Sequence, residues 1–345
     1  MIGYGLAGSV FHAPLIASTP GLTVRTLVTG NPQRQAEARK AHPDSQVVSD
    51  PAEVFGRASE HDFVVVAAPN DVHVDLAGRA LDAGLPVVVD KPLAPSAAEA
   101  RSLVEQAERL GVLITAFMNR RWDSDQMTLR RLLDEGKLGE VLRYESRLER
   151  WRPAISEHEP WREVSAPEAG GGILLDLGSH LVDQALVLFG PVVHVYAEVE
   201  SRRGGVADDD VFLALEHRSG ARSHLWASLG AAAPGPRLRV LGDRAGYIVT
   251  DVDGQEEALR AGARPSDDEE EWGVEPPERW GRLVTGENSE AVASERGDWP
   301  RFYTDLERAL REGSPPPVDP WDAVTGLDLL DAARRSAATA TVVTV

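Results

Sequence analysis

The chain has 345 residues, of which 42% are hydrophobic and 26% charged, a composition typical of a globular protein long enough for two domains. Lys and Arg total 36 while Asp and Glu total 55, so the formal net charge is −19. A chain this acidic repels nucleic-acid phosphates and anionic membrane surfaces unless it carries a local basic patch, and we find none in the sequence. We therefore expect neither nucleic acid nor a membrane as a partner.

The absence of cysteine excludes disulfides, thiolate metal ligands and thiol catalysis, and it is typical of a reducing compartment. No apolar run reaches the roughly 20 residues of a membrane span, and the N-terminus lacks the pattern of a secretory signal. We expect a cytoplasmic protein.

Short apolar runs alternate with helical patterns in the first third of the chain. Strands are expected at residues 22–28, 63–67, 85–89 and 112–117. Helices are expected at residues 33–41, 74–83 and 96–110. Near-continuous β-branched runs separated by helices indicate a parallel sheet covered on both faces. The pattern predicts a doubly wound Rossmann domain over residues 1–120, with its ligand at the carboxyl ends of the strands.

The pattern changes after about residue 120. Helices are expected at residues 125–135, 173–189, 298–313 and 320–338. Strands are expected at residues 140–151, 193–199, 211–216, 223–228, 237–241 and 247–251. These alternating runs predict a mostly antiparallel sheet with one covered face, in an α/β domain over residues 121–345. Residues 264–280 read as a solvated acidic loop, and we expect the C-terminal helices to pack back on the first domain.

The N-terminus matches the dinucleotide-binding pattern G-x-G-x-x-G. Its expected ligands are backbone groups of Gly3, Gly5, Leu6, Ala7 and Gly8. The first glycine permits a tight turn, the second a close approach of the pyrophosphate, and the third close packing of helix on strand. Only Met1 and Ile2 precede the motif, although a strand is needed there. We expect preceding residues to complete the strand; the alternative is a truncated central strand and a compromised cofactor site.

The end of the next strand bears on the choice of cofactor. An acidic residue there would bind the ribose 2′-hydroxyl of NAD. This chain has Thr29, Asn31 and Arg34 instead, with no carboxylate to repel a 2′-phosphate. These residues favour NADP over NAD, although Arg34 is equally interpretable as a solvated helix residue.

Several further motifs occur in a fixed order. They are Phe-His-Ala-Pro at residues 11–14, Ala-Pro-Asn-Asp-Val-His at 68–73, Asp-Lys-Pro at 90–92, and Gly-Gly-Gly-Ile-Leu-Leu-Asp-Leu-Gly-Ser-His at 170–180. In this order and spacing, the sequence resembles the Gfo/Idh/MocA oxidoreductases over nearly its whole length. Residues 11–14, 119–123 and 180–184 are most similar to the NADP-dependent scyllo-inositol dehydrogenase branch.

The resemblance implies a Rossmann domain followed by an α/β domain whose open sheet often mediates oligomerisation, so a dimer or tetramer is expected. It implies hydride transfer between a sugar or polyol hydroxyl carbon and a nicotinamide. Lys91 matches the lysine of the family's Glu-Lys-Pro motif, with Asp90 in place of the glutamate, and Pro92 is expected to follow a cis peptide. Asp176 and His180 match the family's polar pair. Further residues expected to border the cofactor are Pro69, Asn70, His73, Asp90 and Lys91.

The chemistry of alcohol oxidation suits these residue types. A base that titrates near working pH must take the hydroxyl proton, which suits His180. Asp176 lies four residues earlier on the same helix face, where it binds a substrate hydroxyl or orients the imidazole. Lys91 can stabilise a developing alkoxide or share the proton transfer, and the sequence leaves open which of Lys91 and His180 holds the proton. The same pair is also interpretable as a helix cap or, less readily, as metal ligands.

Other polar residues have both functional and structural interpretations. Expected to line the substrate cleft, or else to form structural ion pairs, are Arg121, Trp122, Asp123, Arg150 and Arg152. His12 shapes the packing of the first helix, and residues 208–210 read as a turn before a strand. We interpret three histidines in or beside the sheet strands as surface or core residues: His194, His217 and His224.

The sequence thus predicts an NADP-preferring dehydrogenase of a polyol or sugar, with scyllo-inositol as the best single substrate. One alternative is the NAD-dependent glycosidase chemistry of some relatives, in which the hydride step is transient. Another is an NADP-binding sensor without catalysis, although a sensor has no need of Lys91, Asp176 and His180 together.

Overall fold

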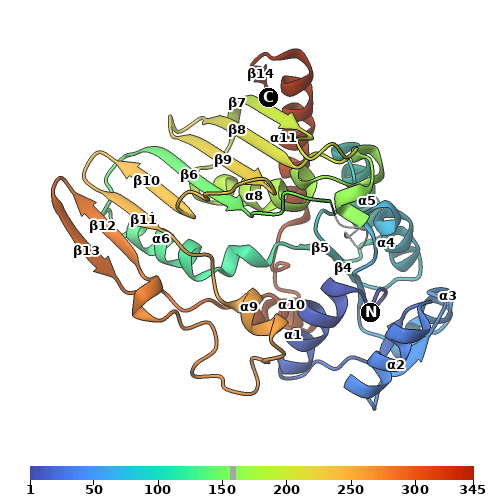
Figure 1. Cartoon of the computed structure of the whole chain (residues 1–345). Helices are drawn as coiled ribbons and strands as arrows, with labels where there is room; N and C mark the ends of the chain where they lie inside the picture. The colour runs from blue at the N-terminus through green and yellow to red at the C-terminus, as the bar shows by residue number, and fades with distance from the viewer. Residues whose placement is uncertain (156–160) are drawn as a thin grey trace. The chain divides into compact units, whose positions relative to one another are not determined.

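The computed structural model describes residues 1–155 and 161–345 (Figure 1). The chain forms two compact units. Unit 1 consists of residues 1–119, 255–272 and 299–324, and unit 2 of residues 120–254, 273–298 and 325–345. Two C-terminal stretches therefore belong to the same unit as the glycine motif. No helix in the described ranges has the length and apolar character needed to cross a membrane.

Unit 1 is built on parallel strands. They are β1 (Thr26–Val28), β2 (Gln46–Val48), β3 (Val64–Val66), β4 (Val87–Asp90) and β5 (Ile114–Phe117). β1 pairs with β2, and β4 lies between β3 and β5. The valines of β3 and β4 are at most 2% exposed, as expected for a sheet covered on both faces.

Residues 1–3 occupy the central position of this sheet. Ile2 bridges Val28 of β1 on one side and Val66 of β3 on the other, both in parallel. The Ile2 amide donates to the Val65 carbonyl at 2.7 Å, and its own carbonyl accepts from Ala67 at 2.8 Å. This short segment therefore joins the two parts of the sheet and leads directly into the glycine motif.

Helices surround the strands of unit 1. They are α1 (Ala13–Ser18), α2 (Pro32–Ala41), α3 (Ala52–Phe55), α4 (His73–Asp82), α5 (Ala97–Leu110), α9 (Gln255–Arg260) and α10 (Pro300–Glu312), with the π-helix η1 (Ala7–His12) and the 3₁₀ turns η2 (Ala58–Glu60) and η3 (Asn70–Val72). Local signals set several ends. Asn31 caps α2, Ser96 caps α5, and Gly111 ends α5 in the left-handed conformation.

Unit 2 is built, in the part of the chain that the structure describes, on a nine-stranded sheet. In spatial order its strands are β13 (Asn288–Val292), β12 (Gly281–Thr285), β11 (Gly246–Val249), β10 (Leu238–Gly242), β6 (Val141–Glu149), β9 (Arg222–Ser228), β8 (Asp210–His217), β7 (Val192–Glu200) and β14 (Val343–Thr344). Every pair is antiparallel except β6 with β9, which is parallel. The expected mostly antiparallel sheet is confirmed.

One face of this sheet is covered and the other is open. Along β8, Val211, Leu213 and Leu215 are buried while the residues between them are partly exposed. α8 (Ser179–Phe189) packs against β6 and β9 on the buried side (Figure 1). Other helical segments of this unit are α6 (Ser124–Asp134), α7 (Trp161–Val164), η5 (Pro167–Ala169), the π-helix η6 (Leu174–Gly178) and η7 (Pro277–Arg279). Two helical segments cross the boundary between the units in the chain. They are η4 (Asn119–Trp122), whose first residue belongs to unit 1, and α11 (Pro320–Thr339), which begins in unit 1 and continues into unit 2.

Some elements differ from the sequence prediction. The expected strand at residues 22–28 forms only from Thr26, because its partner β2 begins at Gln46. The hairpin of β12 and β13 was not expected, and its residues are mostly exposed, so its apolar alternation is weak. The expected loop at residues 264–280 contains a buried Trp272, whose indole donates to Gln255 Oε1 at 3.1 Å.

Candidate active site

The glycine motif leaves no room for side chains at its first and third positions. Gly3 has φ +100°, and a Cβ there would lie 2.3 Å from the Ala67 carbonyl oxygen. A Cβ on Gly8 would lie 2.2 Å from the Gly3 carbonyl oxygen. The tight turn and the close packing expected of these two glycines are confirmed.

The second glycine has a different neighbour. A Cβ on Gly5 would meet only Arg34, with Nη1 at 3.7 Å. The guanidinium of Arg34 therefore lies beside the loop, although Arg34 belongs to α2. The following π-helix η1 has no acidic residue in its first turn, so no carboxylate competes for its N-terminal amides. The open Gly5 and the N-terminus of η1 fit a bound pyrophosphate, and the Arg34 guanidinium beside them fits a further phosphate.

The residues at the end of β1 also gather at this edge. Asn31 Oδ1 accepts from the Arg34 amide at 3.1 Å, so Asn31 caps α2. Thr29 is buried, and its hydroxyl lies 3.4 Å from the Asn31 amide. These contacts hold the loop that carries Arg34, and cofactor binding by all three residues stays a prediction.

Two parallel strand ends carry the next expected residues. After β3, Pro69 precedes η3, Asn70 is buried, and His73 begins α4 with no exposed surface. Both ring nitrogens of His73 lie 2.9 Å from backbone carbonyl oxygens, Nδ1 from Pro92 and Nε2 from Ala68. His73 therefore links the end of β3 to the turn after β4.

Lys91 follows β4 directly, and the expected cis peptide between Lys91 and Pro92 is confirmed. Asp90 Oδ1 accepts from the Lys91 amide at 2.9 Å and lies 3.6 Å from His12 Nε2. The other ring nitrogen of His12 lies 2.5 Å from the Tyr303 hydroxyl, which comes from α10. His12 was expected only to shape the packing of the first helix, and Tyr303 was not among the expected site residues.

The surroundings of Asp90 keep its carboxylate ionised. Burial would raise the pKa of Asp90, but the interaction with His12 and the nearby charges of Lys91 and His73 lower it below the ordinary 3.8. Burial raises the pKa of Tyr303 well above 10, so its hydroxyl keeps its proton. The backbone of Lys91 is thus anchored to a buried carboxylate.

In unit 2, the three glycines before η6 allow a close approach to neighbouring chain. A Cβ on Gly171 would lie 2.0 Å from the Ser165 carbonyl oxygen. Gly172 has φ +91°, and a Cβ there would lie 2.0 Å from Asp208 Oδ2. Asp208 Oδ1 accepts from the Leu174 amide at 2.7 Å. Asp208 was expected only as part of a turn, whereas its carboxylate binds the start of η6.

η6 and α8 carry the expected polar pair. Asp176 lies within the π-helix η6 and is partly exposed, and His180 is the second residue of α8 and 5% exposed. π-Helical turns are rare and frequently occur at functional sites. The two units thus carry the expected catalytic residues separately, with Lys91 on unit 1 and the Asp176–His180 pair on unit 2.

Several candidate substrate residues form ion pairs within unit 2. Arg121 binds Asp183 of α8 through two hydrogen bonds, at 2.9 Å from Nε and 2.6 Å from Nη2. Arg120 Nη1 lies 3.2 Å from Asp123, and burial raises the pKa of Asp123 well above 3.8. Arg121 thus has the structural ion pair that was the alternative to substrate binding.

The remaining candidates have varied surroundings. Trp122 is 9% exposed. Arg152 Nη1 binds Glu163 at 2.8 Å, and the Arg150 amide donates to the Ser228 carbonyl at 2.8 Å. His217 is buried, whereas His194 and His224 are partly exposed. Within the described ranges, no group of three His, Cys, Asp or Glu side chains is arranged to hold a metal ion.

Comparisons with known families agree with this architecture. Residues 1–118 match the model of the Gfo/Idh/MocA oxidoreductase family, NAD-binding Rossmann fold. Residues 130–345 match the model of the C-terminal alpha/beta domain of the same family.

Similar proteins match over nearly the whole chain. The uncharacterized oxidoreductase YdgJ of Escherichia coli is 37% identical, with 98% of this chain and 95% of YdgJ covered. The scyllo-inositol 2-dehydrogenase (NADP(+)) IolW of Bacillus subtilis is 33% identical, with 97% of this chain and 92% of IolW covered. Among solved structures, yvaA of Bacillus subtilis is 31% identical with a TM-score of 0.91, and the alignment covers 100% of this chain and 98% of yvaA. The chain belongs to the Gfo/Idh/MocA family of oxidoreductases.

Proposed function

We propose that this protein is an NADP-dependent dehydrogenase that oxidises a secondary hydroxyl of a polyol or sugar, with scyllo-inositol as the best single substrate. The observation that carries this proposal is the 33% identity to the NADP-dependent scyllo-inositol dehydrogenase IolW over 97% of the chain. The position of Arg34 beside Gly5, together with the absence of a carboxylate at Thr29, Gly30 and Asn31 after β1, supports the choice of NADP.

The residues around the glycine motif would hold the cofactor. The open Gly5 and the N-terminus of η1 would receive the pyrophosphate, Gly3 and Gly8 would shape the turn around it, and Arg34 would bind the 2′-phosphate. When bound, NADP supplies the nicotinamide that accepts the hydride from the alcohol carbon.

The polar residues divide the work on the substrate. Oxidation of a secondary alcohol breaks one C–H and one O–H bond, and the proton needs an acceptor. In our proposal, His180 takes the hydroxyl proton and Lys91 donates a hydrogen bond to the reacting oxygen as negative charge develops there. Asp176 binds a neighbouring hydroxyl or orients the imidazole.

The first experiment measures the reduction of NADP and of NAD by the purified protein against a panel of inositols, aldoses and simple polyols. We expect NADP reduction with scyllo-inositol. Release of free sugar without net reduction of cofactor would instead indicate a glycosidase. Tight NADPH binding without turnover across the panel would favour a sensor.

Substitutions then test the catalytic roles. Lys91→Ala and His180→Ala should each lower hydride transfer at least about 100-fold while the Kd for NADPH changes less than about threefold. Lys40→Ala on α2 and His194→Ala on β7 are matched controls, because both residues are exposed or half-exposed. Unchanged turnover in both catalytic variants would contradict the assignment.

A separate substitution tests the cofactor preference. Thr29→Asp places a carboxylate at the end of β1, where it would repel a 2′-phosphate and accept from the ribose hydroxyl of NAD. The ratio of kcat/KM for NADP to that for NAD should fall. An unchanged ratio would mean that the adenosine pocket lies elsewhere.

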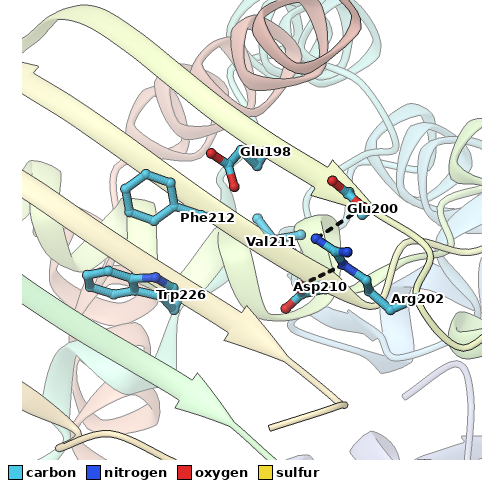
Figure 2. A pocket seen from close by; sticks show the side chains of 7 residues that line it. All are labelled: Glu198, Glu200, Arg202, Asp210, Val211, Phe212 and Trp226. Carbon is cyan, nitrogen blue, oxygen red and sulfur yellow. Dashed lines mark hydrogen bonds and ion pairs between the residues drawn. The ribbon is translucent and has the colours of Figure 1, made fainter. Parts of the chain in front are cut away.

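We also propose that the protein forms a homo-oligomer through the open face of the large sheet. Phe212 and Trp226 lie side by side on this face, with ring centroids 5.1 Å apart (Figure 2). They border a hollow of about 300 Å³. It is also lined by the carboxylates of Glu198, Glu200 and Asp210 and by the guanidinium of Arg202. A face that carries positive charge, negative charge and partly exposed aromatic rings suits a two-fold contact with itself, in which each residue meets its complement on a second copy.

Sedimentation of Phe212→Glu and Trp226→Glu tests this interface, with Leu110→Glu on α5 as a control at another exposed apolar residue. The two sheet variants should sediment as monomers while the control keeps the mass of the unaltered protein. A monomeric unaltered protein at micromolar concentration would contradict the proposal.

A further inference from the structure

His73 has a hydrogen-bonding environment that a neutral histidine does not satisfy. Its ring is fully buried, and its two nitrogens lie 2.9 Å from the carbonyl oxygens of Pro92 and Ala68. A carbonyl oxygen only accepts hydrogen bonds, whereas a neutral imidazole has one N–H and one lone pair. A neutral His73 would therefore place the lone pair of one ring nitrogen against a carbonyl oxygen at hydrogen-bond distance, so that an acceptor faces an acceptor.

We propose that His73 is a permanently protonated, buried imidazolium that positions Lys91. With both nitrogens protonated, it donates one hydrogen bond to the segment after β3 and one to the residue that follows Lys91. These two bonds tie two neighbouring parallel strand ends together at the edge where the Rossmann fold binds its ligand.

The charge on His73 has a counter-charge nearby. Asp90 is buried, and burial alone would raise its pKa, but His12, Lys91 and His73 together lower it. The ionised carboxylate accepts from the Lys91 amide at 2.9 Å. Lys91 therefore stands between two anchored neighbours, Asp90 through its side chain and Pro92 through its carbonyl. Buried charges are tolerated when they are hydrogen-bonded and lie near an opposite charge. His73 has two carbonyl acceptors, and its charge interacts favourably with the ionised Asp90.

His217 provides an internal comparison. Its Nδ1 lies 2.8 Å from the Gly190 carbonyl oxygen, but its Nε2 lies 2.7 Å from the Ser223 hydroxyl. A hydroxyl can donate as well as accept, so a neutral His217 satisfies both partners. Burial lowers the pKa of His217, which agrees with a neutral ring. His73 and His217 are both buried and both have hydrogen-bond partners at the two ring nitrogens, yet they should differ in charge.

The charge is tested by NMR on the unaltered protein labelled with ¹⁵N in its histidine rings. At about pH 8, above the ordinary histidine pKa near 6.5, His73 should show two protonated ring nitrogens and His217 one. The signals are assigned from His73→Gln and His217→Gln, or through bonds to the backbone if a variant does not fold. An unprotonated ring nitrogen on His73 at this pH would overturn the proposal.

The positioning role is tested by kinetics. Both N–H groups of glutamine are on a single nitrogen, which cannot take the place of both ring nitrogens, so His73→Gln should loosen one of the two anchors. We expect a fall in kcat of about tenfold or more, with the Kd for NADPH changed less than about threefold, since small misplacements of a reacting group lower kcat. His217→Gln should leave kcat unchanged. An unaltered kcat in His73→Gln, or equal losses in kcat and NADPH affinity, would refute positioning.

The positioning role rests on the proposed function of Lys91, whereas the charge on His73 does not. If Lys91→Ala retains full activity, the proposed catalytic role fails and positioning fails with it. The ring nitrogens of His73 still report its charge in that case, so the two failures are distinguishable.

Discussion

Replacing Gly172 with alanine should destabilise unit 2 by an amount that the local geometry sets. The new Cβ would lie 2.0 Å from Asp208 Oδ2 and 2.6 Å from its Cγ, so the carboxylate must move. Movement of Asp208 breaks its hydrogen bond to the Leu174 amide, the bond that holds the first turn of η6. The backbone at φ +91° is also unfavourable for alanine.

These two effects can be added. A left-handed backbone costs an alanine about 1–2 kcal/mol. Loss of a hydrogen bond to a charged group costs about 1.5–3 kcal/mol. We therefore expect Gly172→Ala to lower the free energy of unfolding by about 2.5–5 kcal/mol, which for a domain of this size lowers Tm by about 10 °C.

Gly220 offers a matched control. It lies between β8 and β9 with φ +93°, and a Cβ there would have no neighbour within 4 Å. Gly220→Ala should therefore show the backbone cost alone, about 1–2 kcal/mol. Chemical denaturation followed by tryptophan fluorescence, together with calorimetry, measures both variants.

A double substitution isolates the clash. Asp208→Ala alone should cost about 1.5–3 kcal/mol, the value of the lost hydrogen bond. Because Gly172→Ala already breaks that bond, the double variant should be more stable than the sum of the two single losses predicts, by about the same amount. If Gly172→Ala costs no more than Gly220→Ala, the contact with Asp208 is not the reason for a glycine at this position.

Three further substitutions test other parts of the candidate site. Arg34→Ala should weaken NADPH binding about tenfold, or 1.4 kcal/mol, and leave NADH binding unchanged, and Arg39→Ala on the same helix is the control. Equal losses of affinity for both cofactors in binding titrations would contradict a contact between Arg34 and the 2′-phosphate. The ionised Asp90 contributes a stabilisation that is fully present above the ordinary pKa of 3.8 and is lost as the pH falls through the lower pKa of the folded state. Asp90→Asn removes this contribution, so the free energies of unfolding of the variant and the unaltered protein should converge in acid. A constant difference between the two down to about pH 2 would refute this. Arg121→Ala should lower the free energy of unfolding by about 3–5 kcal/mol, because Asp183 stays buried without the arginine that binds it. The double variant Arg121→Ala/Asp183→Ala should lose less. A double variant that is no more stable than Arg121→Ala would argue against the ion pair.

Much of unit 1 follows from local sequence signals. Asn31 and Ser96 cap their helices with side chains three residues from the amide that they bind, and Gly111 ends its helix through its own backbone freedom. The strands β3 and β4 are short runs of valine, and the comparisons confirm the family that the motifs indicated. These features depend on neighbouring residues, and of them the strands and the family were predicted from the sequence.

The contacts around the candidate catalytic residues required the tertiary structure. Asp208 is 34 residues from the amide that it binds, and His12 is 291 residues from Tyr303. Neither pairing follows a helical or strand period, so nothing in the sequence near Asp208 or Tyr303 marked it as part of the site. The exposed hairpin of β12 and β13 was missed for the related reason that its stability does not come from an alternating buried face.

The sequence by itself thus determined the family, the glycine motif and the positions of Lys91, Asp176 and His180, because each of these depends on residue type and short spacing. Only the tertiary structure decided which groups anchor those residues. The hydrogen bonds of His73, for example, require two strand ends to lie side by side, and strand pairing is a property of the folded sheet. Chain segments far apart in sequence come together only when the apolar faces of the sheet are buried, and that burial selects the partners.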